Sequence, residues 1–79
     1  MKVDVRYFAA FREATGIASE ALETGAATAA ALFTECAKRH PQLQSHAASL
    51  VAINDEMAAW EQPLADGDVV LFFPPVAGG

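Results

Sequence analysis

Cysteine, basic residues and long apolar runs are all scarce in this sequence. Cys36 is the one cysteine among 79 residues, and there are two histidines, so a disulfide framework and a cysteine-rich zinc site are both excluded. No apolar run approaches the roughly 20 residues that a membrane helix needs. Residues 1–4 carry a charge pattern unlike that of a signal peptide. We therefore expect a cytoplasmic protein that binds neither metal nor membrane.

Basic residues are outnumbered by acidic ones. Five Lys and Arg stand against ten Asp and Glu, and the formal net charge is −5. Because phosphate binding needs clusters of Lys and Arg, nucleic acid is a poor candidate partner. Residues 50–79 have no base and hold five acids: Asp55, Glu56, Glu61, Asp66 and Asp68. These acids serve either solubility alone or the docking of this half, tail included, on a basic partner whose encounter they steer.

Chain length limits the molecule to one small domain. Typical domains start at roughly 50 residues, and 79 residues are enough for a single small hydrophobic core. A ligand pocket of roughly 300–1,000 Å³ needs walls on several sides. An enzyme with its own deep pocket is therefore not expected.

Hydrophobic patterning predicts an α+β domain. Apolar and polar residues alternate over 2–8 and more weakly over 17–23, and short apolar runs indicate three further strands. The predicted strands are residues 2–8, 17–23, 50–53, 57–60 and 69–73. Residues 9–16 predict a helical turn that ends at Gly16. The main helix is predicted over 29–39, with Thr28 as its cap and Pro41 preventing its continuation.

One helix can cover only one face of such a sheet. The run over 69–73 is apolar on both faces, which is typical of a central strand. Phe8 falls on the polar side of the first strand. Some apolar surface should therefore remain on the uncovered face, where exposed patches often mark a protein partner.

The last six residues carry the strongest functional signal: Pro74, Pro75, Val76, Ala77, Gly78 and Gly79. A terminal Gly-Gly arises by chance in roughly 0.5% of chains, and its simplest interpretation is a frayed end. The functional interpretation is a tail that enters another protein's active site, because glycines have no side chains to clash in a narrow channel. The reacting group would be the α-carboxylate of Gly79, activated most simply as an acyl-adenylate made from ATP.

Several segments together resemble a known family. The stretch 66–79, with its Phe-Phe-Pro-Pro-Val-x-Gly-Gly ending, is similar to the signature of the small sulfur carrier subunit of molybdopterin synthase. Residues 52–54 and 63–68 match the middle of that family, and the helix and the residues up to 49 match in pattern only. The N-terminal match consists of Tyr7-Phe8-Ala9 with Arg12, Glu13 and Gly16.

The resemblance implies a ubiquitin-like β-grasp fold of the α+β class. A mixed sheet of four to five strands would carry one main helix packed on one face. Residues 1–75 would form a single domain, followed by a flexible Gly-Gly tail over 76–79. The chain itself would bind no cofactor, and the catalytic pocket would lie on a larger subunit.

The resemblance also implies a sulfur carrier. An adenylyltransferase related to ubiquitin-activating enzymes would use ATP and Mg to adenylate Gly79, and a persulfide sulfur donor would then convert it to a thiocarboxylate. The tail would insert into the large subunit of molybdopterin synthase, in a heterotetramer of two small and two large subunits. There the sulfur would pass to cyclic pyranopterin monophosphate and form the molybdopterin dithiolene.

Four residues are candidates for partner contact. The resemblance places Phe8, Met57 and Phe73 at positions that contact partners in the family. Strand parity leaves open whether Phe72 or Phe73 faces outward, and the resemblance favours Phe73. Arg12 is interpreted either as an ordinary surface arginine or as the partner of an acidic residue on another protein.

Alternatives remain open for the chemistry and for the function. Cys36 and His40 are spaced i, i+4 and could form a nucleophile pair, although both lie on the apolar stripe of the helix, where cysteine is ordinarily a small hydrophobe. The chain could also be a sulfur carrier for thiamine thiazole synthesis, a ubiquitin-like protein modifier or a plain binding module. The Phe-Phe-Pro-Pro segment favours molybdopterin synthase.

Overall fold

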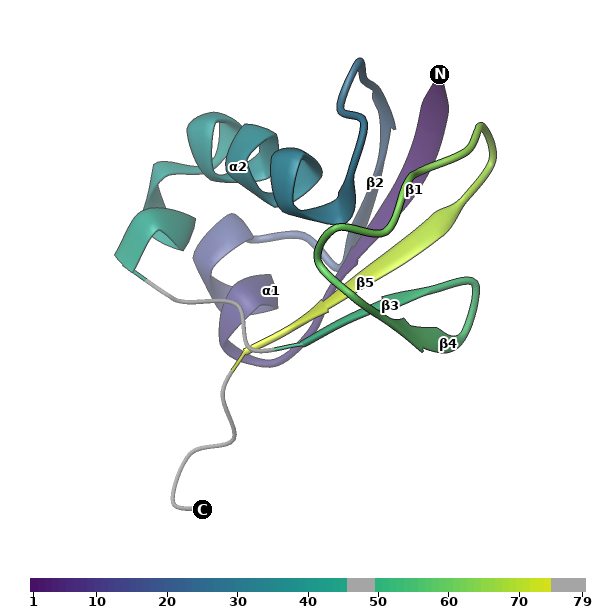
Figure 1. The fold of residues 1–79 in the computed structure, drawn as a ribbon. Coiled ribbons are helices and arrows are strands. Elements are labelled where there is room, and N and C mark those ends of the chain that lie inside the picture. Colours follow the sequence, from purple (N-terminus) through teal and green to yellow (C-terminus); the bar gives the residue numbers. More distant parts are fainter. Residues whose placement is uncertain (46–49, 75–79) are drawn as a thin grey trace.

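A computed structural model describes residues 1–45 and 50–74 and confirms the predicted α+β fold (Figure 1). Five strands form one mixed sheet in the order β2-β1-β5-β3-β4. The helices lie together on one side of this sheet, with α2 as the main helix. Along the chain the elements are β1 (Lys2–Tyr7), α1 (Ala10–Thr15), β2 (Ser19–Glu23), α2 (Ala29–Arg39), the 3-10 helix η1 (Pro41–Ser45), β3 (Leu50–Ile53), β4 (Glu56–Ala58) and β5 (Val69–Phe73).

The last strand, β5, occupies the centre of the sheet. It runs parallel to β1, with Tyr7 opposite Phe72, and antiparallel to β3, with Leu50 opposite Phe73. The sequence predicts a central strand over 69–73, because this run is apolar on both faces. The position of β5 between β1 and β3 confirms this prediction. Because β5 is parallel to β1, the C-terminal end of β5 lies beside the corner that joins β1 to α1.

The hydrophobic core lies between the sheet and its helices. Alternate residues of β1 and β5 point into it, and α1 and η1 each add one fully buried side chain. The core consists of Val3, Val5, Tyr7, Phe11, Leu22, Ala29, Leu32, Cys36, Leu43, Val51, Val70 and Phe72. Leu43 was not anticipated, because residues 42–49 have no clear hydrophobic period.

Local signals in the sequence fix the helix ends. The hydroxyl of Thr28 accepts a hydrogen bond from the backbone N–H of Ala31 at 3.2 Å, so it caps α2 as predicted. Gly16 has a φ of 78° and donates its N–H to the carbonyl of Arg12 at 2.8 Å, which ends α1. Helix α1 therefore follows β1 directly and lies near the end of β5.

The hairpin between β3 and β4 turns at Asn54 and Asp55, where the sequence carries a turn signal, and its second strand begins one residue earlier than predicted. Asn54 and Asp55 both have positive φ, at 52° and 69°, as the two central residues of a type I′ hairpin do. Ile53 consequently pairs with Glu56. The fourth strand therefore covers 56–58 rather than the predicted 57–60.

Within residues 1–45 and 50–74 no helix is long and apolar enough to span a membrane. In the same part of the chain, no three side chains of His, Cys, Asp or Glu are grouped as the ligands of a metal ion would be.

Candidate functional site

The root of the C-terminal tail is the end of β5. Phe72 is fully buried, and its ring meets that of Phe33 edge to face with centroids 4.9 Å apart. Phe73 lies on the opposite, uncovered face of the sheet, so it is the outward residue of the two, as the resemblance implied. Pro74 is half-buried. The other tail residues, Pro75, Val76, Ala77, Gly78 and Gly79, lie outside the described residues, and the predictions made for them stay predictions.

Apolar side chains surround Phe73 on the uncovered face. In the sheet register Leu50 lies opposite Phe73, while Ala52 lies opposite both Leu71 and Met57, so these residues share one face. The exposed fractions of Phe8, Leu50 and Met57 are 39%, 53% and 61%. We call this surface the open-face patch, and its members are Phe8, Leu50, Met57, Leu71 and Phe73.

Sequence reasoning identified three of these five residues and missed Leu50 and Leu71. Leu71 precedes Phe73 by two residues, so it shares the face of Phe73, and this rule could have found it once Phe73 was assigned outward. Leu50 carried no such signal, because its place depends on the register between β3 and β5. Whether the open-face patch binds a partner is a proposal that is taken up below.

Phe8 reaches the open-face patch from the corner between β1 and α1. Its ring stacks on that of Phe73, with the centroids 5.1 Å apart and an interplanar angle of 7°. Aromatic pairs of this kind contribute roughly 0.5–1.5 kcal/mol beyond the area that they bury. The next residue, Ala9, has φ 50° and ψ −123°, a region that costs a non-glycine residue on the order of 1–3 kcal/mol.

Arg12 lies beside Phe8 at the same end of the sheet. The two residues share an open hollow of about 210 Å³ with Arg6, Tyr7, Ala18 and Ser19. Arg6 forms an ion pair with Asp4 at 3.1 Å, whereas Arg12 is exposed and forms no ion pair with any residue in the described part of the chain. Its guanidinium is therefore accessible to an acidic group of another protein, and that pairing stays a prediction.

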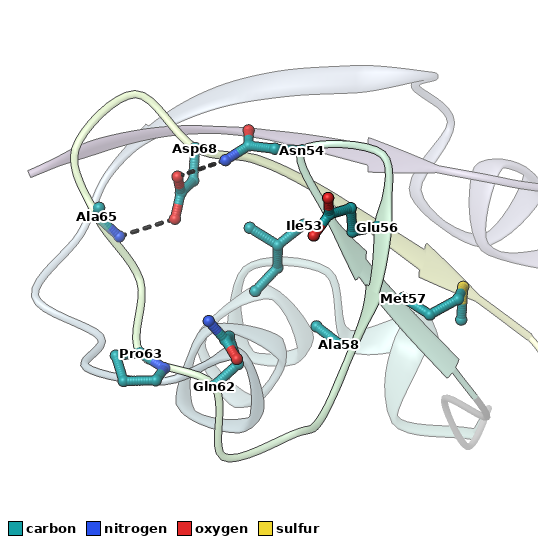
Figure 2. Close-up of a pocket in the computed structure, with 9 residues that line it drawn as sticks. All are labelled: Ile53, Asn54, Glu56, Met57, Ala58, Gln62, Pro63, Ala65 and Asp68. Atoms are coloured by element: carbon teal, nitrogen blue, oxygen red, sulfur yellow. Dashed lines mark hydrogen bonds between the residues drawn. The ribbon is translucent and has the colours of Figure 1, made fainter.

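Most acids of the C-terminal half lie at the far end of β5. A carboxylate oxygen of Asp66 accepts the backbone N–H of Lys2, where β1 begins, at 2.7 Å. Asp68 immediately precedes β5 and accepts hydrogen bonds from the side chain of Asn54 and the backbone N–H of Ala65, both at 2.8 Å. Figure 2 shows the two bonds of Asp68, of which the one from Asn54 links the β3–β4 hairpin to the loop before β5.

The hairpin and this loop border an open hollow of about 400 Å³. Glu56, Met57 and Gln62 are among the residues that line it (Figure 2). The nearly buried Asp68 already has its partners from both sides of the hollow, and no buried side-chain nitrogen or oxygen in the described residues lacks one. The hollow is therefore a consequence of how the loop is tied to the hairpin, at the end of β5 opposite to Phe73.

Four of the five acids of the C-terminal half do not lie at the end of β5 from which the tail continues. Because β3 is antiparallel to β5, both the β3–β4 turn and the loop before β5 lie where β5 begins, at the end opposite to Phe73 (Figure 1). Asp68 and Phe73 are five residues apart along this extended segment, which at about 3.3 Å per residue is roughly 16 Å. Asp55, Glu56, Asp66 and Asp68 are thus remote from Phe73 at the end of β5, and two of them are hydrogen-bonded within the fold.

Tyr7, Glu20 and His40 form a polar cluster on the helix side of the sheet. The Tyr7 hydroxyl donates to Oε2 of Glu20 at 2.6 Å, and Nε2 of His40 lies 2.7 Å from the same oxygen. Arg39 adds a contact of 3.3 Å to the other oxygen. Burial alone would raise the pKa of the Glu20 carboxyl, but the hydrogen bonds from Tyr7 and His40 outweigh it and hold this pKa below its usual value. The cluster joins β1 and β2 to the end of α2.

Cys36 and His40 do not form a nucleophile pair. Cys36 is fully buried, and burial raises the pKa of its thiol to about 11, so the thiol stays protonated at neutral pH. The imidazole of His40 is occupied by Glu20. The interpretation of Cys36 as a small hydrophobe in the core is therefore the one that fits.

Comparison with known proteins places the whole chain in one group. The model of the ThiS family matches residues 5–79. The molybdopterin synthase sulfur carrier subunit of Escherichia coli (strain K12) is 36% identical over 87 aligned residues, which cover 98% of this chain and 99% of that protein.

Solved structures agree with this grouping. SAMP1 from Haloferax volcanii superposes with a TM-score of 0.86 at 28% identity and full coverage of both chains. A protein–protein complex of subunits 1 and 2 of the molybdopterin-converting factor from Helicobacter pylori contains a chain that superposes with a TM-score of 0.68 at 26% identity, again with full coverage. The ubiquitin-like β-grasp fold that the resemblance implied is therefore confirmed.

Proposed function

We propose that this chain, which belongs to the ThiS family of sulfur carriers, is the small subunit of a molybdopterin synthase and carries sulfur as a thiocarboxylate at Gly79. The full-length relationship to sulfur carrier subunits of molybdopterin synthase is the observation that carries the proposal. The Phe-Phe-Pro-Pro-Val-x-Gly-Gly ending supports it. The acceptor of the sulfur is cyclic pyranopterin monophosphate, in which two transfers form the dithiolene.

Activation of Gly79 proceeds in two stages on other proteins. A terminal carboxylate oxygen attacks the α-phosphorus of ATP on the activating enzyme, which uses Mg, and pyrophosphate leaves. A persulfide sulfur then attacks the acyl carbon and displaces AMP. Cleavage of the resulting acyl disulfide by a thiol leaves the thiocarboxylate on Gly79 and a disulfide on the donor.

The described residues of this chain position the tail and hold the partner. β5 anchors the tail in the centre of the sheet through Phe72, while Phe73 presents its ring on the other face. The side chains of Cys36, Glu20 and His40 are engaged within the fold. The large subunit therefore supplies the substrate pocket and the groups that transfer protons.

The open-face patch is the docking surface for the large subunit and for the activating enzyme. Exposed apolar surface beside the tail is suited to a partner into which the tail inserts, and the accessible Arg12 adds a charged contact at its rim. A complex between the two subunits of a related converting factor supports a partner of this kind. The assembly that we propose contains two small and two large subunits.

Intact-mass analysis of the chain isolated from its host tests the proposal. Exchange of one carboxylate oxygen for sulfur adds about 16 Da, and treatment with iodoacetamide should then alkylate this sulfur. A chain that retains its carboxylate mass when it is isolated, and after incubation with ATP, activating enzyme and persulfide donor, would contradict the proposal.

A protein modifier is the second candidate function, because the likeness to SAMP1 is strong. In that case the activated Gly79 would form an amide bond with a lysine instead of accepting sulfur. Digestion of host proteins followed by mass spectrometry separates the two functions. Lysines that carry the C-terminal residues of this chain would favour the modifier, and their absence together with a thiocarboxylate would favour the carrier.

A further inference from the structure

Ala9 has a backbone conformation that L-residues rarely adopt. Its φ is 50° and its ψ is −123°, and the backbone N–H of Phe11 donates to the carbonyl oxygen of Phe8 at 3.0 Å. Residues 8–11 thus form a type II′ turn with Ala9 as the first central residue. Glycine is the ordinary residue at this position, because an L-side chain is strained there.

The methyl group of Ala9 does not compensate for this strain by packing, since the residue is exposed. The conformation is instead imposed from both sides. Tyr7 is buried and donates its N–H to the carbonyl of Ala18 at 2.9 Å, while Phe11 is fully buried and the N–H of Glu13 donates to the carbonyl of Ala9 at 3.2 Å. Both ends of the turn are therefore held by the core and by the first bond of α1.

The turn determines where the ring of Phe8 lies. Tyr7 and Phe11 enter the core, whereas Phe8 between them lies on the open face and stacks on Phe73 at 5.1 Å. An extended conformation at Ala9 would redirect the chain between two anchored residues and move the Phe8 ring away from Phe73. The stack therefore depends on one strained residue next to the root of the tail.

We propose that Ala9 is a positioning residue: its type II′ turn holds Phe8 against Phe73 and so assembles the aromatic part of the open-face patch before a partner arrives. Binding to a preformed surface avoids the cost of ordering side chains on association. This inference rests on the proposed function, since it takes the large subunit to be the protein that binds the patch.

Two substitutions at Ala9 and one at Phe8 test the inference. Ala9→Gly keeps the turn, because glycine adopts positive φ without strain. Ala9→Val opposes the turn, because a β-branched residue at positive φ is a genuine outlier. Both are combined with Phe8→Ala in a double-mutant cycle, and affinity for the large subunit is measured by calorimetry at a temperature where each variant is folded.

The effect of Ala9→Val on affinity should depend on the presence of the Phe8 ring. Ala9→Gly should bind within about twofold of the parent protein and melt at the same or a higher temperature. Ala9→Val should weaken binding at least about tenfold, yet have no further effect in the Phe8→Ala background. A purely structural role predicts instead that the valine weakens binding equally in both backgrounds, and that result would overturn the inference.

A partner-free measurement separates this inference from the proposed function. In the isolated chain, the ring protons of Phe73 should show ring-current shifts and cross-peaks to Phe8 that persist in Ala9→Gly and are lost in Ala9→Val. Persistence of both in a folded Ala9→Val chain would overturn the positioning role, whatever the partner is. A different outcome is that the parent chain fails to bind the large subunit while Ala9→Val still loses the stack of Phe8 on Phe73. That combination would contradict the proposed function but would support the role of Ala9 in positioning Phe8. A folded Ala9→Gly chain that binds more than about tenfold more weakly than the parent protein would also overturn the inference.

Discussion

Alanine substitutions at Phe72 and Phe73 separate the core from the proposed interface. Phe72 is fully buried, and its ring stacks on Trp60 at 6.0 Å and meets Phe33 at 4.9 Å. Its truncation should lower the free energy of unfolding by about 3–5 kcal/mol. The free energy of unfolding of a 79-residue domain is about 4–12 kcal/mol. A substantial fraction of Phe72→Ala molecules should therefore be unfolded.

Phe73→Ala should behave in the opposite way. The ring is half-buried, so the loss of its stack on Phe8 and of part of its apolar contact should lower the free energy of unfolding by about 1–2 kcal/mol. Affinity for the large subunit should fall by more than about 1 kcal/mol, which corresponds to roughly fivefold. The Phe73→Ala chain should therefore remain folded while its binding is weakened.

Urea unfolding followed by circular dichroism measures the first effect, and calorimetric titration with the large subunit measures the second. Ile17 provides a matched control, because it is exposed to a similar extent as Phe8, at 37%, and lies outside the open-face patch. Ile17→Ala should leave the affinity unchanged. A folded Phe73→Ala chain that binds normally, or one that is as unstable as Phe72→Ala, would refute the assignment of Phe73 to the interface.

Three further predictions concern the tail, the polar cluster and the acidic end. Deletion of Gly79, or addition of one alanine after it, should abolish sulfur transfer without changing the melting temperature; a one-residue extension that still supports molybdopterin formation without processing would contradict the carrier role. The pKa of the Glu20 carboxyl is lowered on folding, so its contribution to stability is present above the ordinary glutamate pKa and is lost as the pH falls through the folded value. Glu20→Gln should therefore be less stable than the parent protein at pH 7, and its free energy of unfolding should vary less with pH below about pH 5. The double variant Asp55→Asn, Glu56→Gln should associate with the large subunit within about twofold of the parent rate, because these acids lie farther from Phe73 at the end of β5 than the screening length of about 8 Å at physiological ionic strength. A stopped-flow rate that falls tenfold would show that they do steer the encounter.

Periodicity and caps were sufficient to predict most of the fold. The bounds of α2 follow from Thr28 and from the residues before Pro41, and the end of α1 follows from Gly16. The central position of β5 follows from its apolar character on both faces. These features depend on short-range chemistry, which the sequence displays directly.

The register of the strands is a different matter, because it depends on partners that are distant in the sequence. Phe72 and Phe73 are equally apolar, and only the pairing of β5 with β1 and β3 decides which one enters the core. The same pairing places Leu50 beside Phe73 and sends the acidic loops to the far end of β5. The strain at Ala9 had no signal either, since Phe-Ala-Ala-Phe contains none of the residues that a type II′ turn prefers.

Sheet topology thus explains why the tail site is apolar in a chain with a net charge of −5. A parallel β1–β5 pair brings the corner with Phe8 to the point where the chain leaves the sheet, and it brings the loop with Asp66 to the opposite end. The tail carries a terminal negative charge, and Asp68, the acidic residue closest to it in sequence, lies at the other end of β5, roughly 16 Å along the strand from Phe73. The surface around Phe73, from which the tail continues, is therefore apolar, so a partner that binds the open-face patch does not have to neutralise these acids.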